Sequence, residues 1–218
     1  MSAADADAGS AAAAPARSIE IELKFDVDAG VPLPDWSGLP GVASVSAGEA
    51  RSLDAMYIDT DDAALARAGY ALRRRTGGPD AGWHIKGPRR TDGGRIELHW
   101  PLGGAEAVPD GARAELAPVV GDAALVPLAR IRNERVAYLL LSESGEVVAE
   151  FADDHVRTTD ERAGIEREWQ EWEIELGPAG PTDPAARAAF FAAVEKAATA
   201  AGARAAASDS KLARALGH

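Results

Sequence analysis

The stretch IEIELKF, residues 19–25, alternates apolar and charged side chains and does most to decide the fold. Successive side chains of a β-strand point to opposite faces, so the isoleucines, Leu23 and Phe25 share one face. Glu20, Glu22 and Lys24 share the other face. The pattern therefore predicts a β-strand with one apolar and one fully ionic face.

The same alternation recurs in four further segments, which predicts a mostly antiparallel sheet. The ionic faces comprise Arg73 and Arg75 in residues 70–75, His84 and Lys86 in 82–86, Arg95, Glu97 and His99 in 95–100, and Glu171, Glu173 and Glu175 in 166–176. Further strands are expected at residues 54–58, 129–141 and 146–153, and helices at 63–68, within 110–128, at 184–201 and at 211–216.

These ionic faces are segregated by sign. Carboxylates dominate the first and last of the five segments, whereas the segment from Arg67 to Arg95 holds eight Arg or Lys residues against two Asp residues, a net charge of +6. Three glutamates on one strand face lie about 7 Å apart and repel one another unless cations lie between them. The alternative is that each face is the solvated side of an ordinary sandwich. Taken together, the five faces favour a closed antiparallel barrel with a charged interior and helices packed outside.

Composition limits the other possibilities. The chain has 218 residues, a formal net charge of −12 and no cysteine. It is expected to form one domain, residues 18–218, after a disordered N-terminal tail, residues 1–17. The net charge argues against a nucleic-acid partner, and no apolar run is long enough for a membrane-spanning helix. A cytoplasmic location is the default expectation for a cysteine-free chain without a signal peptide.

An ordered set of motifs resembles the CYTH family, also described as triphosphate tunnel metalloenzymes. The matching positions are Glu20, Glu22 and Lys24, then Tyr57-Ile58-Asp59-Thr60, Leu72-Arg73-Arg74-Arg75, Trp83 with Lys86, Arg95 with Glu97, Arg130-Ile131-Arg132, Asp153, Glu173 with Glu175, and Lys211. Two positions depart from the family pattern, because Asp154 follows Asp153 directly and Glu171 extends the usual glutamate pair. The last segment, residues 210–216, also resembles the junction with a helical CHAD domain, a possible partner.

The resemblance implies an α+β fold, a closed eight-stranded antiparallel β-barrel that forms a tunnel. It implies hydrolysis of a small triphosphate with Mg²⁺ or Mn²⁺, most simply inorganic tripolyphosphate to pyrophosphate and phosphate, by a monomer or homodimer. Thiamine triphosphatase, class IV adenylyl cyclase and a noncatalytic module that binds polyphosphate or nucleotide stay open as alternatives. The implied phosphate-binding residues are Lys24, Arg73, Arg75, Lys86, Arg95, Arg130, Arg132 and Lys211. The implied metal ligands are Glu20, Glu22, Glu97, Asp153, Glu173 and Glu175, with Glu22, Lys24, Glu173 and Glu175 as the catalytic set.

Overall fold

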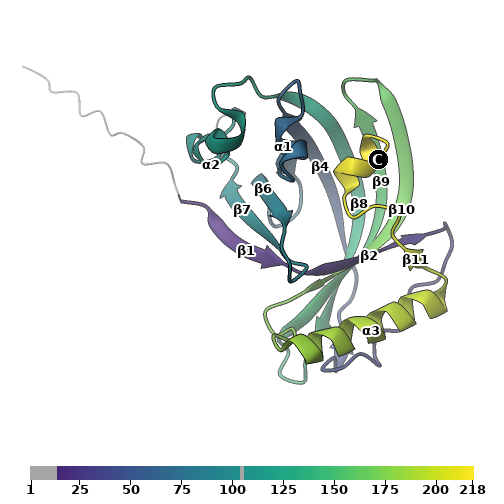
Figure 1. Ribbon diagram of the computed structural model, residues 1–218. Coiled ribbons are helices and arrows are strands. Elements are labelled where there is room, and N and C mark those ends of the chain that lie inside the picture. The colour runs from purple at the N-terminus through teal and green to yellow at the C-terminus, as the bar shows by residue number, and fades with distance from the viewer. Residues whose placement is uncertain (1–13, 104–105) are drawn as a thin grey trace, which may run out of the picture.

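The computed structural model describes residues 14–103 and 106–218 and consists of one antiparallel β-sheet with four helices (Figure 1). The strands are β1 (Ala16–Glu20), β2 (Glu22–Val27), β3 (Ser44–Val45), β4 (Glu49–Asp59), β5 (Ala71–Thr76), β6 (Gly82–Arg89), β7 (Arg95–Pro101), β8 (Val126–Leu141), β9 (Val147–Asp160), β10 (Ile165–Leu176) and β11 (Arg204–Ala205). The helices are α1 (Ala64–Arg67), α2 (Asp110–Val120), α3 (Pro184–Ala201) and α4 (Lys211–Ala215). The antiparallel sheet with helices confirms the predicted fold class at this level.

The sheet is not the closed eight-stranded barrel that was expected. Eleven strands are described, in the order β1-β7-β6-β5-β4-β8-β9-β10-β2-β11, with β3 paired to β8. This order has two ends, and strand pairing does not join them. The predicted barrel was therefore wrong in its number of strands and in its closure.

The stretch 19–25 is divided between two strands, and this division determines how the ends of the sheet are placed. Residues up to Glu20 pair with β7, whereas residues from Glu22 pair with β10, so the pairing partner changes at Ile21. Figure 1 shows β1 and β2 as one continuous extended segment, coloured purple. Because the first strand of the pairing order and its ninth lie on this one segment, the β7 side and the β10 side of the sheet are brought next to each other.

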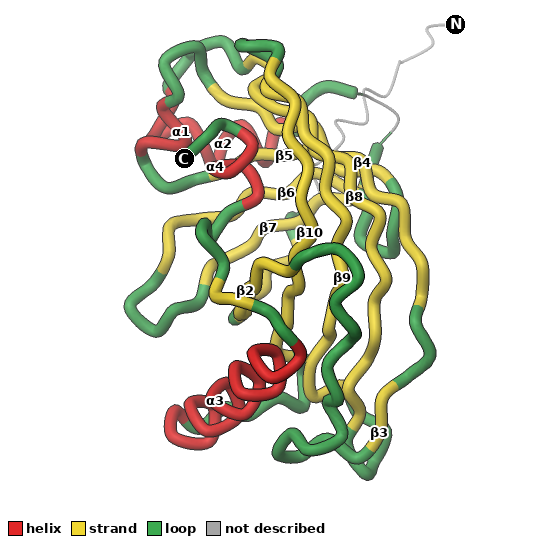
Figure 2. The backbone as a smooth tube through the Cα atoms, turned by 90° about the vertical axis from the view of Figure 1, so that its right-hand side faces the viewer, coloured by secondary structure: helices red, strands yellow, loops and turns green. Residues whose placement is uncertain are grey.

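Helices α1, α2 and α3 cover the apolar side of the sheet, whereas α4 lies on the pocket side, where its Lys211 lines the pocket. Figures 1 and 2 show α3 at one end and α1, α2 and α4 at the other. Helix α3 buries Phe190 and Val194 in a cluster with Trp172 and Phe151. Helices α1 and α2 pack on Trp83 and its neighbours, and α4 packs on a smaller third cluster. The polar residues of the alternating strands lie on the side away from the clusters under α1, α2 and α3. The cluster under α4 lies on the polar side, because its members Ala55, Tyr57 and Ile131 line the pocket.

Several predicted boundaries shift. Ala16 and Arg17 belong to β1, so the expected disordered tail is wrong at those positions, and residues 1–13 lie outside the described part of the chain. Of the range 110–128 in which helix was expected, α2 takes up Asp110–Val120 and continues through Pro118, whereas Pro127 is already in β8. The helix expected at residues 63–68 is found as α1, Ala64–Arg67, and Asp59 accepts the backbone N–H groups of Leu65 and Ala66.

Among the described residues, no helix combines the length and the apolar character that a membrane-spanning helix needs.

Candidate functional site

The ionic strand faces meet in one pocket of about 500 Å³. Of the residues expected at the site, Glu20, Glu22, Lys24, Arg73, Arg75, Lys86, Arg95, Glu173, Glu175 and Lys211 line it. They come from β1, β2, β5, β6, β7, β10 and α4, segments that are far apart in sequence. The placement follows from parity, since each strand turns its alternate charged side chains inward and its apolar ones toward the helices.

The β10 side of the pocket carries the acidic wall. Strand β10 pairs with β2 so that Glu173 lies opposite Lys24 and Glu175 lies opposite Glu22. Directly opposed residues of an antiparallel pair share a face, so these four charges stand side by side in the pocket. Lys24 Nζ donates to Glu22 Oε2 at 2.9 Å and also contacts Glu173.

The basic wall is formed by β5, β6 and β7. Arg73 and Arg75 point inward from β5, and Lys86 joins them from β6, where its Nζ lies 2.6 Å from Glu20 Oε2. Arg73 also contacts the hydroxyl of Tyr57 at 3.3 Å and Oε1 of Glu97 at 3.3 Å. These contacts hold the Arg73 guanidinium in place, and its fixed fork of donors matches the oxygens of a phosphate group.

Glu97 lies beneath the basic wall and does not line the pocket. It is 8% exposed, and its Oε1 is 3.0 Å from Nδ1 of the buried His84. Burial lowers the pKa of His84 to about 4. Although burial alone would raise the pKa of Glu97, its contacts with His84, Lys86 and Arg73 hold that pKa far below the ordinary value. Glu97 thus helps to hold the Arg73 side chain in place. The resemblance implied instead that Glu97 is a metal ligand, but Glu97 does not line the pocket.

Two glutamates of the acidic wall carry perturbed ionisation. Burial, together with nearby Glu20 and Glu22, raises the pKa of Glu175 to about 8. Burial also raises the pKa of Glu20 to about 7 although Lys86 opposes it. Within the described part of the chain, the Glu175 carboxylate has no ion-pair partner, unlike Glu20, Glu22 and Glu173. The corner formed by Glu20, Glu22 and Glu175 therefore holds more negative charge than its neighbours neutralise.

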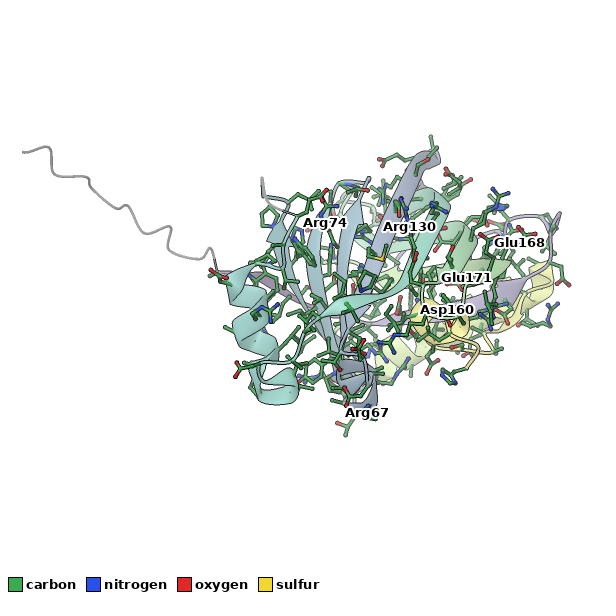
Figure 3. All side chains as sticks on the ribbon, turned by 90° about the horizontal axis from the view of Figure 1, so that it is seen from above. Arg67, Arg74, Arg130, Asp160, Glu168 and Glu171 are labelled. Carbon is green, nitrogen blue, oxygen red and sulfur yellow. The ribbon has the colours of Figure 1, made fainter. Side chains whose placement is uncertain are left out.

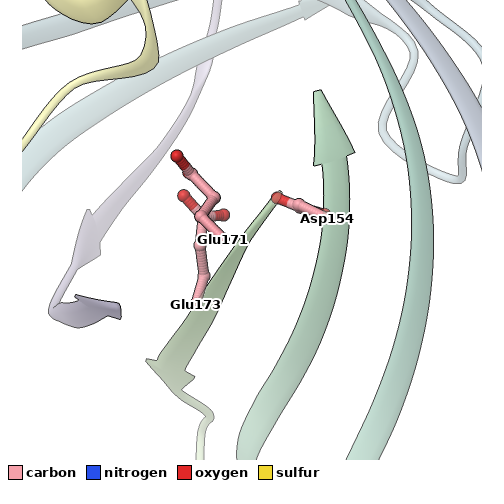
Figure 4. Close-up of side chains that lie close together, drawn as sticks. All are labelled: Asp154, Glu171 and Glu173. Atoms are coloured by element: carbon pink, nitrogen blue, oxygen red, sulfur yellow. The ribbon is translucent and has the colours of Figure 1, made fainter. Parts of the chain in front are cut away.

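A dense ionic cluster, which we call the carboxylate cage, lies beside the pocket and comprises Asp154, Glu171 and Glu173, of which Glu173 lines the pocket. One oxygen of each lies within 4.8 Å of the others, and all three residues are buried (Figure 4). Arg135 donates to both oxygens of Asp154 at 2.7 Å and to Glu173 Oε2 at 2.5 Å. Lys211 Nζ contacts an oxygen of each cage carboxylate, at 2.5 to 2.8 Å.

Besides Glu97, three expected site residues lie outside the pocket lining: Arg130, Arg132 and Asp153. Arg130 pairs with Asp54, with Nε 2.9 Å from Oδ1, and the side chain of Arg132 is 55% exposed. Arg130 and Arg74 both lie opposite Met56 on neighbouring strands, so they share the sheet face away from the pocket, and Figure 3 labels them both. Asp153 accepts from the indole N–H of Trp172 at 3.0 Å on the helix-covered side.

Four polar residues that line the pocket were not predicted from the sequence. Strand β8 contributes Asn133 and Arg135, and β4 and β9 contribute Arg51 and Glu150, all of which line the pocket. Asp154 faces the pocket side, where it lies opposite Glu171 on β10. The sequence did not show whether Asp153 or Asp154 faces the pocket, because neighbouring residues of a strand point to opposite faces. The pairing of β9 with β10 resolves this choice in favour of Asp154.

The acidic corner fits a hard divalent cation. Carboxylate oxygens are the ligands that Mg²⁺ and Mn²⁺ prefer, and Glu20, Glu22 and Glu175 offer them from adjacent strands. Glu20 Oε2 is buried, and Lys86 Nζ, 2.6 Å away, is the one cation paired with it in the described structure. A cation at this corner would balance the excess negative charge and bring the raised pKa values of Glu20 and Glu175 down.

Comparisons with known proteins agree with this geometry. The sequence matches the family described as CYTH domain over residues 18–201. Two proteins from strains of Mycobacterium tuberculosis, both described as uncharacterised, are 37% identical over 195 residues, which cover 84% of this chain. The chain spans only 37% of the length of these relatives.

Solved structures share the fold at low sequence identity. A Bacillus halodurans protein, provisionally described as an adenylate cyclase, is 19% identical with a TM-score of 0.55, covering 91% of this chain and 97% of that one. A Hippeastrum protein, provisionally described as an adenylyl cyclase with a dominant triphosphatase activity, is 18% identical with a TM-score of 0.52. That match covers 91% of this chain and 94% of the other.

Proposed function

The chain belongs to the CYTH family, and from this premise we propose that its pocket binds a small triphosphate and hydrolyses it with a divalent metal ion. The substrate we propose is inorganic tripolyphosphate, cleaved to pyrophosphate and phosphate. The observation that carries the proposal is the meeting of a basic wall and an unneutralised acidic corner in one pocket of about 500 Å³. A site for anion binding alone would gain nothing from the three carboxylates of that corner.

The basic residues supply the contacts to the phosphates. Arg73 and Arg75 present planar forks for two oxygens at a time, whereas Lys24 and Lys86 act as point charges. Arg135 belongs to this set in place of the predicted Arg130 and Arg132, because it is the arginine of β8 that lines the pocket. Together these side chains hold the triphosphate and neutralise the charge on its nonbridging oxygens as the terminal phosphorus–oxygen bond breaks.

The acidic corner supplies the metal ligands. Glu20, Glu22 and Glu175 would hold Mg²⁺ or Mn²⁺, with Glu173 beside them. When bound, such an ion supplies charge neutralisation at the phosphates and a coordinated water of lowered pKa. Oxygens of these carboxylates would orient an attacking water by accepting its hydrogen bonds, and the low exposure of Glu20 and Glu22 would limit competition from bulk solvent.

The pocket lining favours an inorganic substrate over a ring-bearing one. Among the described residues that line the pocket, Tyr57 is the only aromatic, and its hydroxyl is already bonded to Arg73. Base or thiazolium recognition usually relies on an aromatic face for stacking. Tripolyphosphate needs charge alone, which Lys24, Arg73 and Lys86 supply in this pocket.

The test is a product analysis with matched variants. The protein would be incubated with tripolyphosphate, ATP or thiamine triphosphate and with Mg²⁺ or Mn²⁺, and phosphate, pyrophosphate and cyclic AMP would be measured. We expect metal-dependent release of phosphate and pyrophosphate from tripolyphosphate, lost in Glu175→Gln and retained in Arg74→Met, whose side chain lies outside the pocket. Preferred turnover of thiamine triphosphate or formation of cyclic AMP would redirect the assignment to those activities. Tight binding without any product would identify a noncatalytic module.

A further inference from the structure

The wall of the pocket formed by β4, β5 and β8 holds three polar side chains with open hydrogen-bonding groups. Arg51, Arg75 and Asn133 all line the pocket, and Asn133 is only 5% exposed. The Nε of each arginine and the Oδ1 of Asn133 are buried, and none of these atoms has a hydrogen-bond partner among the described residues. Buried polar groups in native proteins are nearly always paired, so two donors and one acceptor left open on one wall point to a ligand.

Strand register places the three side chains next to one another. Asn133 lies directly opposite Leu53, so Arg51 and Ala55 are its diagonal neighbours on the same face. Ala55 in turn lies opposite Arg75 on β5. Arg51 therefore lies to one side of the amide and Arg75, one strand farther away, to the other. Diagonal neighbours in a sheet are within reach of long side chains, so both guanidinium groups can serve a ligand that contacts Asn133.

The two arginines keep positive charge for an anion although each has a carboxylate partner. Arg51 pairs with Glu49, whose side chain is 64% exposed, and Arg75 pairs with Asp80, whose side chain is 51% exposed. Water screens much of the charge of such exposed carboxylates. Glu150, the second partner of Arg51 at 3.2 Å, is also partly exposed. The guanidinium groups themselves are largely buried, so their charge acts on the pocket more strongly than that of their partners.

The open acceptor determines which kind of anion fits. A fully ionised phosphoryl group carries no hydrogen and cannot donate to Oδ1 of Asn133. Orthophosphate keeps at least one O–H at every pH at which a typical protein is folded, whereas sulfate has none near neutral pH. A protonated tetrahedral oxyanion thus offers oxygens to the two guanidinium groups and an O–H to the amide oxygen. These groups match the open donors and the open acceptor in kind.

We infer that this wall is a subsite for orthophosphate, in which Arg51 and Arg75 bind oxygens of the anion and Asn133 accepts its O–H. The inference rests on the proposed function only for the source of the ligand, because that reaction releases orthophosphate in the same pocket. Arg75 also belongs to the proposed triphosphate site, so orthophosphate and tripolyphosphate compete for it.

The first experiment compares orthophosphate with methyl phosphate by calorimetry of the wild type, without metal or triphosphate. A phosphate monoester loses its last proton with a pKa of about 6. At pH 5 both ligands are therefore monoanions with an O–H, and at pH 8 both are mainly dianions, of which only orthophosphate keeps one. We expect the ratio of the Kd of methyl phosphate to that of orthophosphate to be at least tenfold larger at pH 8 than at pH 5. Titration of pocket glutamates affects both ligands alike and cancels in this ratio.

The second experiment removes each partner of the anion at pH 8. Asn133→Leu has nearly the same volume but no acceptor, so it should weaken orthophosphate at least tenfold and change the affinity for sulfate less than threefold. Arg51→Met should weaken both anions at least tenfold. Arg132→Met is the matched control, because the side chain of Arg132 is exposed outside the pocket lining, and it should match the wild type.

A ratio that is the same at both pH values, a wild type that binds orthophosphate no better than sulfate, or an unchanged orthophosphate affinity in Asn133→Leu would overturn the inference. If Asn133→Leu does not fold, the ratio measured on the wild type decides the question. None of these readouts involves turnover. A protein that binds orthophosphate in this way but leaves tripolyphosphate intact would refute the proposed function and not the subsite, and the reverse result would refute the subsite alone.

Discussion

Two glutamates that lie two residues apart on β10, on the same face, should respond to the same substitution with opposite signs. Glu175 has no ion-pair partner in the described structure, whereas Glu173 accepts from Lys24, Lys211 and Arg135. In the absence of metal, Glu175→Gln should therefore stabilise the protein. Glu173→Gln should destabilise it by about 3–5 kcal/mol, because three buried cations lose their shared carboxylate.

The size of the Glu175 effect follows from its pKa. The carboxyl has a pKa of about 8 in the folded protein against an ordinary value of 4.5. Between these values the native state binds one more proton than the unfolded state, so the stability of the wild type falls by about 1.4 kcal/mol per pH unit as the pH rises. A neutral glutamine removes this loss, and the advantage of Glu175→Gln should grow by roughly 3 kcal/mol from pH 5 to pH 7.5.

The assay is urea denaturation in EDTA at both pH values, followed by the fluorescence of the buried tryptophans. We expect Glu175→Gln to have a higher free energy of unfolding than the wild type at pH 7.5 and nearly the same value at pH 5. Equal or lower stability of Glu175→Gln at pH 7.5 would refute the reasoning, since it would mean that the carboxylate is already neutralised in the folded state.

Three further predictions follow from single contacts. Arg73→Met should raise the KM for tripolyphosphate by roughly 10- to 100-fold through the loss of charge-assisted hydrogen bonds, whereas Arg74→Met should leave it unchanged in steady-state assays. Mn²⁺ should raise the melting temperature more at pH 8 than at pH 6 in calorimetry, because the carboxyls of the acidic corner must lose protons to bind it. Gly82→Ala should lower the urea midpoint by an amount equivalent to about 1–3 kcal/mol, because its Cβ would lie 2.4 Å from the Trp100 carbonyl oxygen. Gly38→Ala, with open space around its Cβ, should not change the midpoint.

The sequence predicted the part of the site that depends on local alternation. Apolar and charged side chains alternate without exception in residues 19–25 and 171–176, whereas Ala71 and Arg74 interrupt the pattern in 70–75. The charged residues of these segments that line the pocket as expected are Glu20, Glu22, Lys24, Arg73, Arg75, Glu173 and Glu175. Parity within a strand needs no knowledge of its neighbours. Such faces can therefore be assigned from the residues alone.

The remainder depends on how strands pair, and pairing is not encoded locally. Strand β8 carries charged or polar residues on both faces from Arg130 to Arg135, so its alternation does not show which face turns inward. Its register with β4 places Arg135 opposite Arg51 and Asn133 opposite Leu53, which makes 133 and 135 the inward positions. The break at Ile21 is equally nonlocal, because it arises where one extended segment exchanges β7 for β10 as its partner.

The most direct test of the central claim is a crystal structure of the protein grown with tripolyphosphate and Mn²⁺, with anomalous scattering used to locate the metal. We predict a Mn²⁺ peak bound by Glu20, Glu22 and Glu175, with the phosphate oxygens held by Arg73, Arg75 and Lys86 in the pocket between the two walls. A triphosphate bound elsewhere on the surface, or a pocket that stays free of both metal and phosphate at saturating concentrations, would contradict the account.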